Sequence, residues 1–248
     1  MNDITAIIIA RNEECNIAKA IASLKGFPEI LVMDSGSTDR TVEIARSLGA
    51  TVHQTDWPGY AKQRKRAITK AGNEWILFLD ADESLDRALK QELLTMPLDG
   101  TKKGFYLKRG NYFLKRQIRR SRWGNDWQLR LFMKSSANIP EVDVHEGVIV
   151  NGSTDKIYHG FIRHDTIQSL YRYLEKLDEY TLLEARQKTK DGRKFSGFKL
   201  CWQPLSEFWK LYIVLQGWRE GMRGLCIAAF SALGRFLVMA KIRENGNG

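Results

Sequence analysis

The chain has 248 residues, 43% hydrophobic and 27% charged, and its 39 lysines and arginines against 29 acids give a formal net charge of +10. Charges mixed into this much apolar sequence exclude wholesale disorder. The positive charge indicates anionic partners, either nucleotide phosphates, acidic lipids or nucleic acid, without choosing among them.

Two further features bear on the compartment. The three cysteines form no Cys-x-x-Cys motif and cannot pair completely, so no disulfide framework is expected. The first apolar run, residues 4–10, follows Asp3 rather than basic residues and stops at Arg11. This pattern is not that of a signal peptide, and the cytoplasm is the expected compartment.

Strand and helix patterns alternate through the first hundred residues. Short apolar runs at 5–10, 29–33, 50–54 and 74–79 predict strands. Helical patterns cover 12–24, 37–48, 61–71 and 86–95, with Asn12 as the expected N-cap of the first. Strands separated by helices of this length predict an α/β fold with a parallel sheet.

The alternation stops after Pro97. Residues 104–108, 128–133 and 144–150 are predicted strands joined by irregular segments. From Thr166 the pattern is helical to about 188, and two apolar helical stretches follow between 205 and 241. We therefore expect an α/β domain over residues 1–165, with halves 1–97 and 98–165, and a helical region over 166–248.

Acidic residues follow two of the predicted strands, where ligands of open parallel sheets bind. Asp34 follows the second strand, and Asp80-Ala-Asp82-Glu83 follows the fourth. In extended chain Asp80 and Asp82 point to the same side, which suits Mg²⁺ or Mn²⁺ bridging a diphosphate. The alternative is that the acids from Asp82 onward only begin the next helix.

Three phrases, in chain order, carry a family resemblance. They are Ile-Ile-Ala-Arg-Asn-Glu-Glu-Cys-Asn-Ile, Val-Met-Asp-Ser-Gly-Ser-Thr-Asp and Phe-Leu-Asp-Ala-Asp-Glu. Together they resemble family 2 glycosyltransferases of the GT-A fold, most strongly over residues 3–95. The resemblance implies a Rossmann-like, mostly parallel sheet with a C-terminal helical appendage. It makes 1–97 the nucleotide-sugar-binding half and 98–165 the acceptor and catalytic half.

The resemblance also implies roles for individual residues. It places donor contacts at Ala10 and Glu13, after the first strand. Lys62 and Arg64, on a basic helix, fall where family members often contact the donor, although a solvated helix face explains them equally well.

At the acidic positions the implied roles are sharper. Asp34 matches the residue that recognises uracil or ribose, Asp80 a nucleotide contact, and Asp82 the metal ligand. Among the later histidines, His164 is the predicted further metal ligand, at the start of a helix. Arg130 either faces phosphate or acceptor, or forms a structural ion pair.

Transfer to an acceptor hydroxyl requires a base. The stretch Asp126-Trp-Gln-Leu-Arg-Leu-Phe and the triplet Val-His-Glu146 resemble the subset of the family that makes lipopolysaccharide cores. Glu146 is the favoured catalytic base, and Asp126 and Asp143 are the alternatives.

Two basic, apolar segments indicate a surface partner. Residues 108–122 hold seven lysines and arginines and no acid, interleaved with aromatics, which suits an anionic bilayer or nucleic acid. In the tail, only 11 residues separate Arg223 from Arg235, short of the ~20 that span a membrane. We expect helices lying in the membrane interface and no nucleic acid; packing on the core and a homo-oligomer contact are left open.

These observations predict a metal-dependent, inverting enzyme that moves a hexose from a UDP-sugar to a lipid-linked saccharide at the inner face of the cytoplasmic membrane. Two alternatives remain. A nucleotidyltransferase should carry a glycine-rich loop after the first strand, where this chain has Arg-Asn-Glu-Glu. A non-catalytic basic module that binds membrane or nucleic acid would not need the acids at the strand ends.

Overall fold

The structure is a computed structural model that describes residues 2–57, 59–140, 147–167 and 169–245. It consists of two compact units. The first comprises Met1–Arg109 with Trp127–His164, and the second comprises Gly110–Asp126 with Asp165–Gly248. Strands β6, β8 and β11 each have residues in both units.

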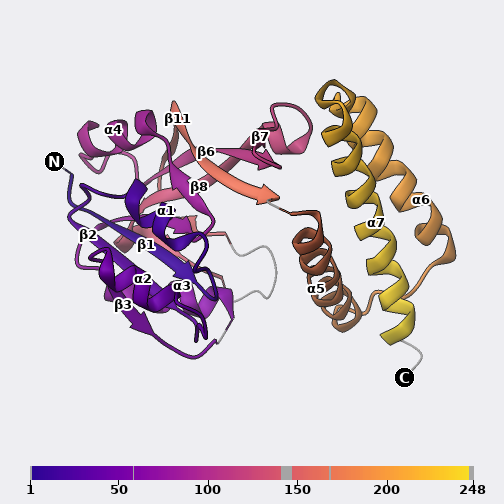
Figure 1. Cartoon of the computed structure of the whole chain (residues 1–248), viewed down its shortest axis with the longest axis horizontal. Coiled ribbons are helices and arrows are strands. Elements are labelled where there is room, and N and C mark those ends of the chain that lie inside the picture. The colour runs from indigo at the N-terminus through magenta and orange to yellow at the C-terminus, as the bar shows by residue number, and fades with distance from the viewer. Residues whose placement is uncertain (1, 58, 141–146, 168, 246–248) are drawn as a thin grey trace. The chain divides into compact units, whose positions relative to one another are not determined.

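The first unit begins with the predicted alternation of strands and helices. Its elements are β1 (Ile4–Ala10), α1 (Ile17–Ser23), β2 (Glu29–Asp34), α2 (Thr41–Ser47), β3 (Thr51–Gln54), α3 (Tyr60–Lys70), β4 (Trp75–Asp80), β5 (Glu83–Leu85) and α4 (Arg87–Thr95). The later strands are β6 (Gly104–Phe113), β8 (Asp126–Met133), β9 (Ala137–Asn138), β10 (Ile149–Val150) and β11 (Thr154–Ile167). Figure 1 shows α1 and α3 beside the strands.

One sheet of nine strands runs through the described residues, in the order β3-β2-β1-β4-β8-β6-β11-β5, with β7 (Arg116–Gln117) paired to β6. The first four strands are parallel, and Ile7 of β1 lies between Leu31 and Phe78 of its neighbours. Beyond β4 the sheet continues with the antiparallel strand β8. The predicted α/β fold with a parallel sheet is confirmed.

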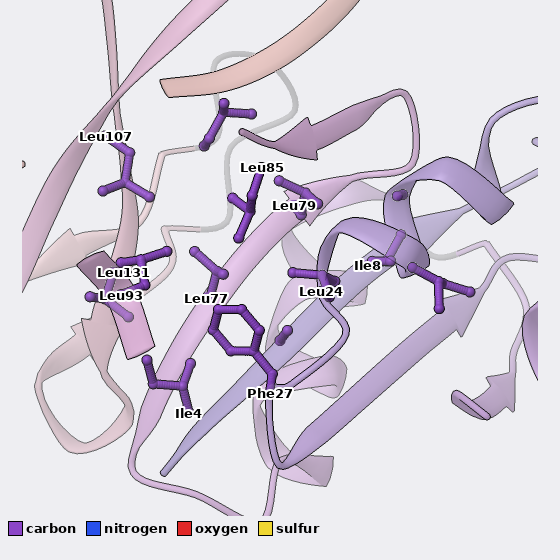
Figure 2. Close-up of a cluster of buried hydrophobic side chains, with 14 of the residues drawn as sticks. Ile4, Ile8, Leu24, Phe27, Leu77, Leu79, Leu85, Leu93, Leu107 and Leu131 are labelled. Carbon is purple, nitrogen blue, oxygen red and sulfur yellow. The ribbon is translucent and has the colours of Figure 1, made fainter. Parts of the chain in front are cut away.

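Apolar residues on both faces of β1 account for its central position. Ile4 and Ile8 face one cluster with Leu24 and Leu93 from the α1 and α4 regions (Figure 2). Ile7 faces the other cluster, which includes alanines of α3. A strand that is buried on both faces needs this continuous apolar run, and the run places the end of β1 beside the ends of β2 and β4.

Several strands and one helix cap differ from the sequence expectations. Neither β5 nor β11 was predicted, and they pair with each other in antiparallel register. The strand predicted over 104–108 extends to Phe113 as β6. The N-cap of α1 is Asn16, whereas Asn12 has a positive φ of 54° in the preceding loop. The strand predicted over 144–150 is described only from residue 147 onward, and that part contains β10.

The second unit is mainly helical. It contains α5 (Leu170–Lys190), α6 (Gly197–Trp209), a π-helical turn (Lys210–Val214), a short 3₁₀ turn (Gly217–Glu220) and α7 (Met222–Asn245). Helix α7 packs along both α5 and α6, as Figure 1 shows. A further small cluster joins Phe113 and Ile118 of the β6–β7 segment to Ile167 and Ile227. The predicted C-terminal helical region is confirmed.

Helix α7 also meets a test for membrane spans. In the described part of the chain, Met222–Glu244 is the one helix long and apolar enough to cross a bilayer by length and composition. A third of its most apolar window is buried inside the unit. The core helices of soluble proteins can have the same length and apolar composition.

Candidate functional site

The turn between β4 and β5 brings three acids together. Asp80 ends β4, Asp82 lies in the turn, and Glu83 begins β5. The Glu83 carboxylate accepts a hydrogen bond from the backbone N–H of Asp80 at 3.0 Å, which closes the turn. Because β4 is one of the four parallel strands, this turn lies at the carboxyl end of those strands, where the sequence predicted the site.

His164 reaches the same turn from β11. It pairs with Glu83 in the β11–β5 ladder, and its Nε2 lies 3.4 Å from Oδ2 of Asp82. The sequence placed His164 at the start of a helix, which is wrong, because the helix begins only at Leu170. The juxtaposition of His164 with Asp82 depends on the unpredicted β5–β11 pairing.

Arg130 of β8 connects the acids. Its Nη2 donates to Oδ2 of Asp80 at 2.6 Å and to Oε1 of Glu83 at 2.8 Å. Arg109 of β6 donates to the same Glu83 oxygen at 3.2 Å. Only 6% of Arg130 is exposed, and within the described residues its Nε is buried without a hydrogen-bond partner. Such buried charges are tolerated because they pair with one another.

Desolvation and the guanidinium groups act in opposite directions on the two acids. Desolvation raises the pKa of Asp80, but Arg130 and Arg64 outweigh it and hold that pKa below its usual range. At Glu83 desolvation outweighs Arg130, so its pKa is raised. The pKa of Arg130 is also raised, because the adjacent carboxylates outweigh its desolvation. Asp80 and Arg130 are therefore an ion pair at neutral pH.

A cavity of about 330 Å³ opens beside this network. Its lining combines three arginines, one acid and aromatic side chains with polar and small residues: Arg64, Phe78, Asp80, Tyr106, Arg109, Trp127, Gln128, Leu129, Arg130, Gly147 and Val148. Arg64 of α3 lies 3.8 Å from Oδ1 of Asp80 and over the Phe78 ring. Three guanidinium groups around one carboxylate leave a positive cavity that suits a phosphate-bearing ligand.

Asp34 forms the loop that follows β2. It is fully buried, and its carboxylate accepts hydrogen bonds from the backbone N–H groups of Gly36 and Ser37 and from the Ser37 hydroxyl. The adjacent Ser35 N–H donates to the carbonyl of Ala10. In this structure Asp34 therefore holds the loop, and its contact with a base or ribose stays a prediction.

The other predicted donor contacts lie in different environments. Glu13 accepts a hydrogen bond from Asn16 at the start of α1, and its N–H donates to Thr41 at the start of α2. Lys62 is exposed to solvent on α3, whereas Arg64, on the same helix, lines the cavity. Lys62 and Arg64, which were predicted together as donor contacts, therefore lie in different environments, one in solvent and one at the cavity.

The three predicted bases are only partly described. Asp126 begins β8, and its Oδ2 accepts a hydrogen bond from Asn111 at 3.0 Å. Asp143 and Glu146 lie outside the described residues. The choice of base therefore stays a prediction.

Two of the described side chains are candidates to hold a metal ion. No group of three or more histidine, cysteine or acidic side chains able to hold a metal occurs in the described ranges. Asp82 and His164 supply one carboxylate and one imidazole at 3.4 Å. Magnesium usually binds through one or two protein carboxylates together with substrate phosphates and water, so this donor set fits an ion that shares its coordination with a ligand.

Three residues of the site were missed by the sequence reasoning. Glu83 was counted among the acids that follow the fourth strand but was given no role of its own, although an acid directly after the Asp80-Ala-Asp82 motif was a signal for a role in the site. Arg109 and Trp127 also line the cavity. Arg109 was counted only as part of a basic segment, and nothing in the sequence showed which side of β6 it occupies.

The family follows from comparison with known proteins. Residues 5–156 match the family described as glycosyl transferase family 2. This match covers more than half of the chain, so the chain belongs to family 2 and is a glycosyltransferase enzyme.

Individual relatives extend the likeness to the whole chain. A glycosyltransferase of Rickettsia typhi is 32% identical, over 98% of this chain and 88% of its own. The lipopolysaccharide core biosynthesis glycosyltransferase LpsC of Rhizobium meliloti is 31% identical, over 97% and 92%. The crystal structure of Staphylococcus aureus TarS 1–349 covers 98% of this chain and 92% of its own with a TM-score of 0.52 at 15% identity, which supports the GT-A fold.

Proposed function

We propose that this glycosyltransferase moves a hexose from a UDP-sugar to a lipid-linked saccharide, with inversion and with the help of Mg²⁺ or Mn²⁺. The observation that carries the proposal is the pairing of Asp82, in the β4–β5 turn, with His164. Asp80 of the same turn lines the cavity that contains three arginines. A diphosphate leaving group needs both a divalent cation and positive charge, and this arrangement supplies positions for each.

In this proposal different residues bind the metal ion, the phosphates and the two substrates. Asp82 and His164 hold the metal ion, which when bound neutralises charge on the departing diphosphate. Arg64 and Arg130 line the cavity on the side of Asp80 and orient the phosphates. Residues 1–97 bind the donor and 98–165 bind the acceptor.

Inversion requires a base that takes the proton of the acceptor hydroxyl as the oxygen attacks the sugar carbon. Glu146 is the proposed base, with Asp126 and Asp143 as alternatives. Trp127 lies on the cavity wall with Lys156 over its ring and Tyr158 against its edge. An aromatic wall of this kind suits the apolar face of an acceptor sugar.

The acceptor class is proposed from the relatives. LpsC is named for lipopolysaccharide core biosynthesis, and this chain matches nearly its whole length. A lipid-linked core saccharide at the inner face of the cytoplasmic membrane is therefore the proposed acceptor. Core glycan from cells that lack the protein should miss one hexose; an unchanged core would contradict this acceptor.

Thermal shift tests the donor and the metal. UDP with Mn²⁺ should stabilise the native protein by about 2.7 kcal/mol at a hundredfold excess over Kd, since ligands that bind only the folded state stabilise it by mass action. Asp82→Asn should lose the Mn²⁺-dependent part of this shift and retain folding. A shift that is equal with and without Mn²⁺, or unaffected by the substitution, would contradict the metal site.

Transfer assays test the base and the reaction class. Glu146→Gln should keep the UDP shift and lose transfer by at least about a hundredfold, because general-base catalysis contributes 10²–10⁴-fold. Full turnover would move the role to Asp126 or Asp143. With a donor labelled in both sugar and uridine, only the sugar label should enter the acceptor; incorporation of uridine label would instead indicate a nucleotidyltransferase.

A further inference from the structure

Helix α6 has an apolar face that the unit does not cover. Phe198, Trp202, Leu205 and Trp209 recur at helical spacing and are 58% to 75% exposed. The rings of Phe198 and Trp202 stack on each other. Although the helix is apolar in composition, none of its 13 described residues is buried. Its other side contributes Leu200 to a cluster with Ala185 and residues of α7.

The exposed charge in the stretch that holds α6 is mainly positive. From residue 191 to 214 the exposed charged residues are the acid Asp191 and four cations, Arg193, Lys194, Lys199 and Lys210. The other acid in this stretch, Glu207, has a side chain only 13% exposed and is paired with Arg122. The face therefore combines exposed tryptophans with an excess of exposed cations.

The basic β6–β7 segment adds further cations at the end of α6. The backbone N–H groups of Arg119 and Arg120 both donate to Glu220, and the N–H of Ser121 donates to the carbonyl of Leu215. These bonds fix exposed arginines next to the turns that follow α6. Trp218, 54% exposed, lies on the same turns.

We infer that this face of α6, with Trp218 and the adjoining arginines, docks onto an anionic lipid bilayer. Tryptophan side chains are stable at the level of lipid headgroups, and lysines on an apolar helix face can reach anionic phosphates while their stems stay in apolar surroundings. The inference deepens the proposed function and rests on it, since a lipid-linked acceptor has to be reached at a membrane.

Comparison with α5 supports a bilayer over another protein. Helix α5 also exposes apolar residues, including Tyr180 and Leu183, but it exposes the acids Glu175, Asp178 and Glu179 beside them. A second copy docked face to face on α6 would bring the basic residues of one copy toward those of the other, which costs like-charge repulsion. Leu205 and Val214 in the same exposed region suit acyl chains better than nucleic-acid bases, which stack on aromatic rings.

Vesicle flotation with the full-length protein tests the docking surface. The protein should float with vesicles of phosphatidylglycerol and phosphatidylethanolamine and stay behind with phosphatidylcholine alone. Trp202→Ser with Trp209→Ser should weaken binding by about tenfold for each indole lost. Lys199→Gln with Lys210→Gln should weaken it by about fivefold for each charge. The matched control on α5, Tyr180→Ser with Leu183→Ser, should float as the unchanged protein does.

Three results would overturn the inference. They are no flotation with anionic vesicles, an equal loss in the α5 control, and protein that resists both high salt and alkaline washing, which would mean that α7 crosses the bilayer. If the tryptophan variant does not fold, the lysine variant carries the test, because both lysines are exposed.

UDP thermal shift without vesicles separates the two proposals. Lost flotation with an intact, Mn²⁺-dependent UDP shift contradicts only this surface. Intact flotation without a UDP shift contradicts only the proposed transfer chemistry. The exposed Cys201, on the same helix, gives an independent readout, because a polarity-sensitive dye there should shift to the blue with anionic vesicles.

Discussion

The two units depart from ordinary burial in opposite directions. The first unit buries charged side chains, with Glu83 and Arg130 inside and paired. The second unit exposes apolar side chains, such as Trp202 and Trp209. Each departure costs free energy unless something compensates it. In the first unit the compensation is a set of ion pairs, and in the second we infer that a lipid surface provides it. The unusual environment of these residues is therefore the best guide to where each unit binds its partners.

The largest expected effect on stability concerns the buried charges. Arg130→Met should lower the free energy of unfolding by about 3–5 kcal/mol, because it leaves Glu83 buried without its main partner. Arg66→Met is the matched control, since Arg66 pairs with Asp56 at an exposed position and should cost less than about 1 kcal/mol. Urea unfolding measures both.

A double variant sharpens this test. Glu83→Gln combined with Arg130→Met removes both charges and should recover part of the loss. If Arg130→Met costs no more than the Arg66 control, the first unit does not depend on internal ion pairs, and the contrast between the units fails.

Close packing in the first unit gives the next effect. Gly160 of β11 has φ +82°, and a Cβ there would lie 2.2 Å from the backbone nitrogen of Leu89 at the start of α4. Gly160→Ala should destabilise the fold by at least about 2 kcal/mol, through backbone strain and displacement of α4 together. Gly49→Ala, with a similar φ of +84° and open space around it, should cost only about 1 kcal/mol. Thermal unfolding of both variants separates the clash from the strain.

The smallest effect compares tryptophans across the units. Trp209→Gln should change the free energy of unfolding by no more than about 0.5 kcal/mol, because the side chain is largely exposed. Trp75→Gln in β4 should cost about 3 kcal/mol or more, since Trp75 is buried against Phe105. An equal cost at both positions would mean that α6 is covered by protein in solution.

Much of the fold was predictable from local sequence. The run from Ile4 to Ala10 is apolar on both faces, and such a run has few stable positions outside a central strand. Asp80 and Asp82 were found because they directly follow another such strand. Strand β11 was missed because its residues are mixed in polarity, with Lys156, His159 and Gly160 among them, and its pairing with β5 is a long-range choice.

The sequence indicated many of the residues of the site but not which of them contact one another. Arg130 was a candidate with two equal interpretations; the structure shows its ion pairs, and the same residue also lines the cavity. Its partners Asp80 and Glu83 lie 50 and 47 residues earlier in the chain, beyond the reach of any periodic pattern. The roles of Asp34, Asp82, His164 and Glu146 in donor binding and transfer stay predictions.

Residues Gly110–Asp126, which include the end of β6 and all of β7, belong to a unit whose remaining residues come much later in the chain. Phe113 and Ile118 are covered by Ile167 and Ile227, so during synthesis they leave the ribosome well before the residues that cover them. In the nascent chain these apolar side chains therefore stay exposed, accessible to chaperones and prone to aggregation, until α7 has been synthesised. In a protein shortened from its C-terminus so that Ile227 is lost, Phe113 and Ile118 would remain partly uncovered.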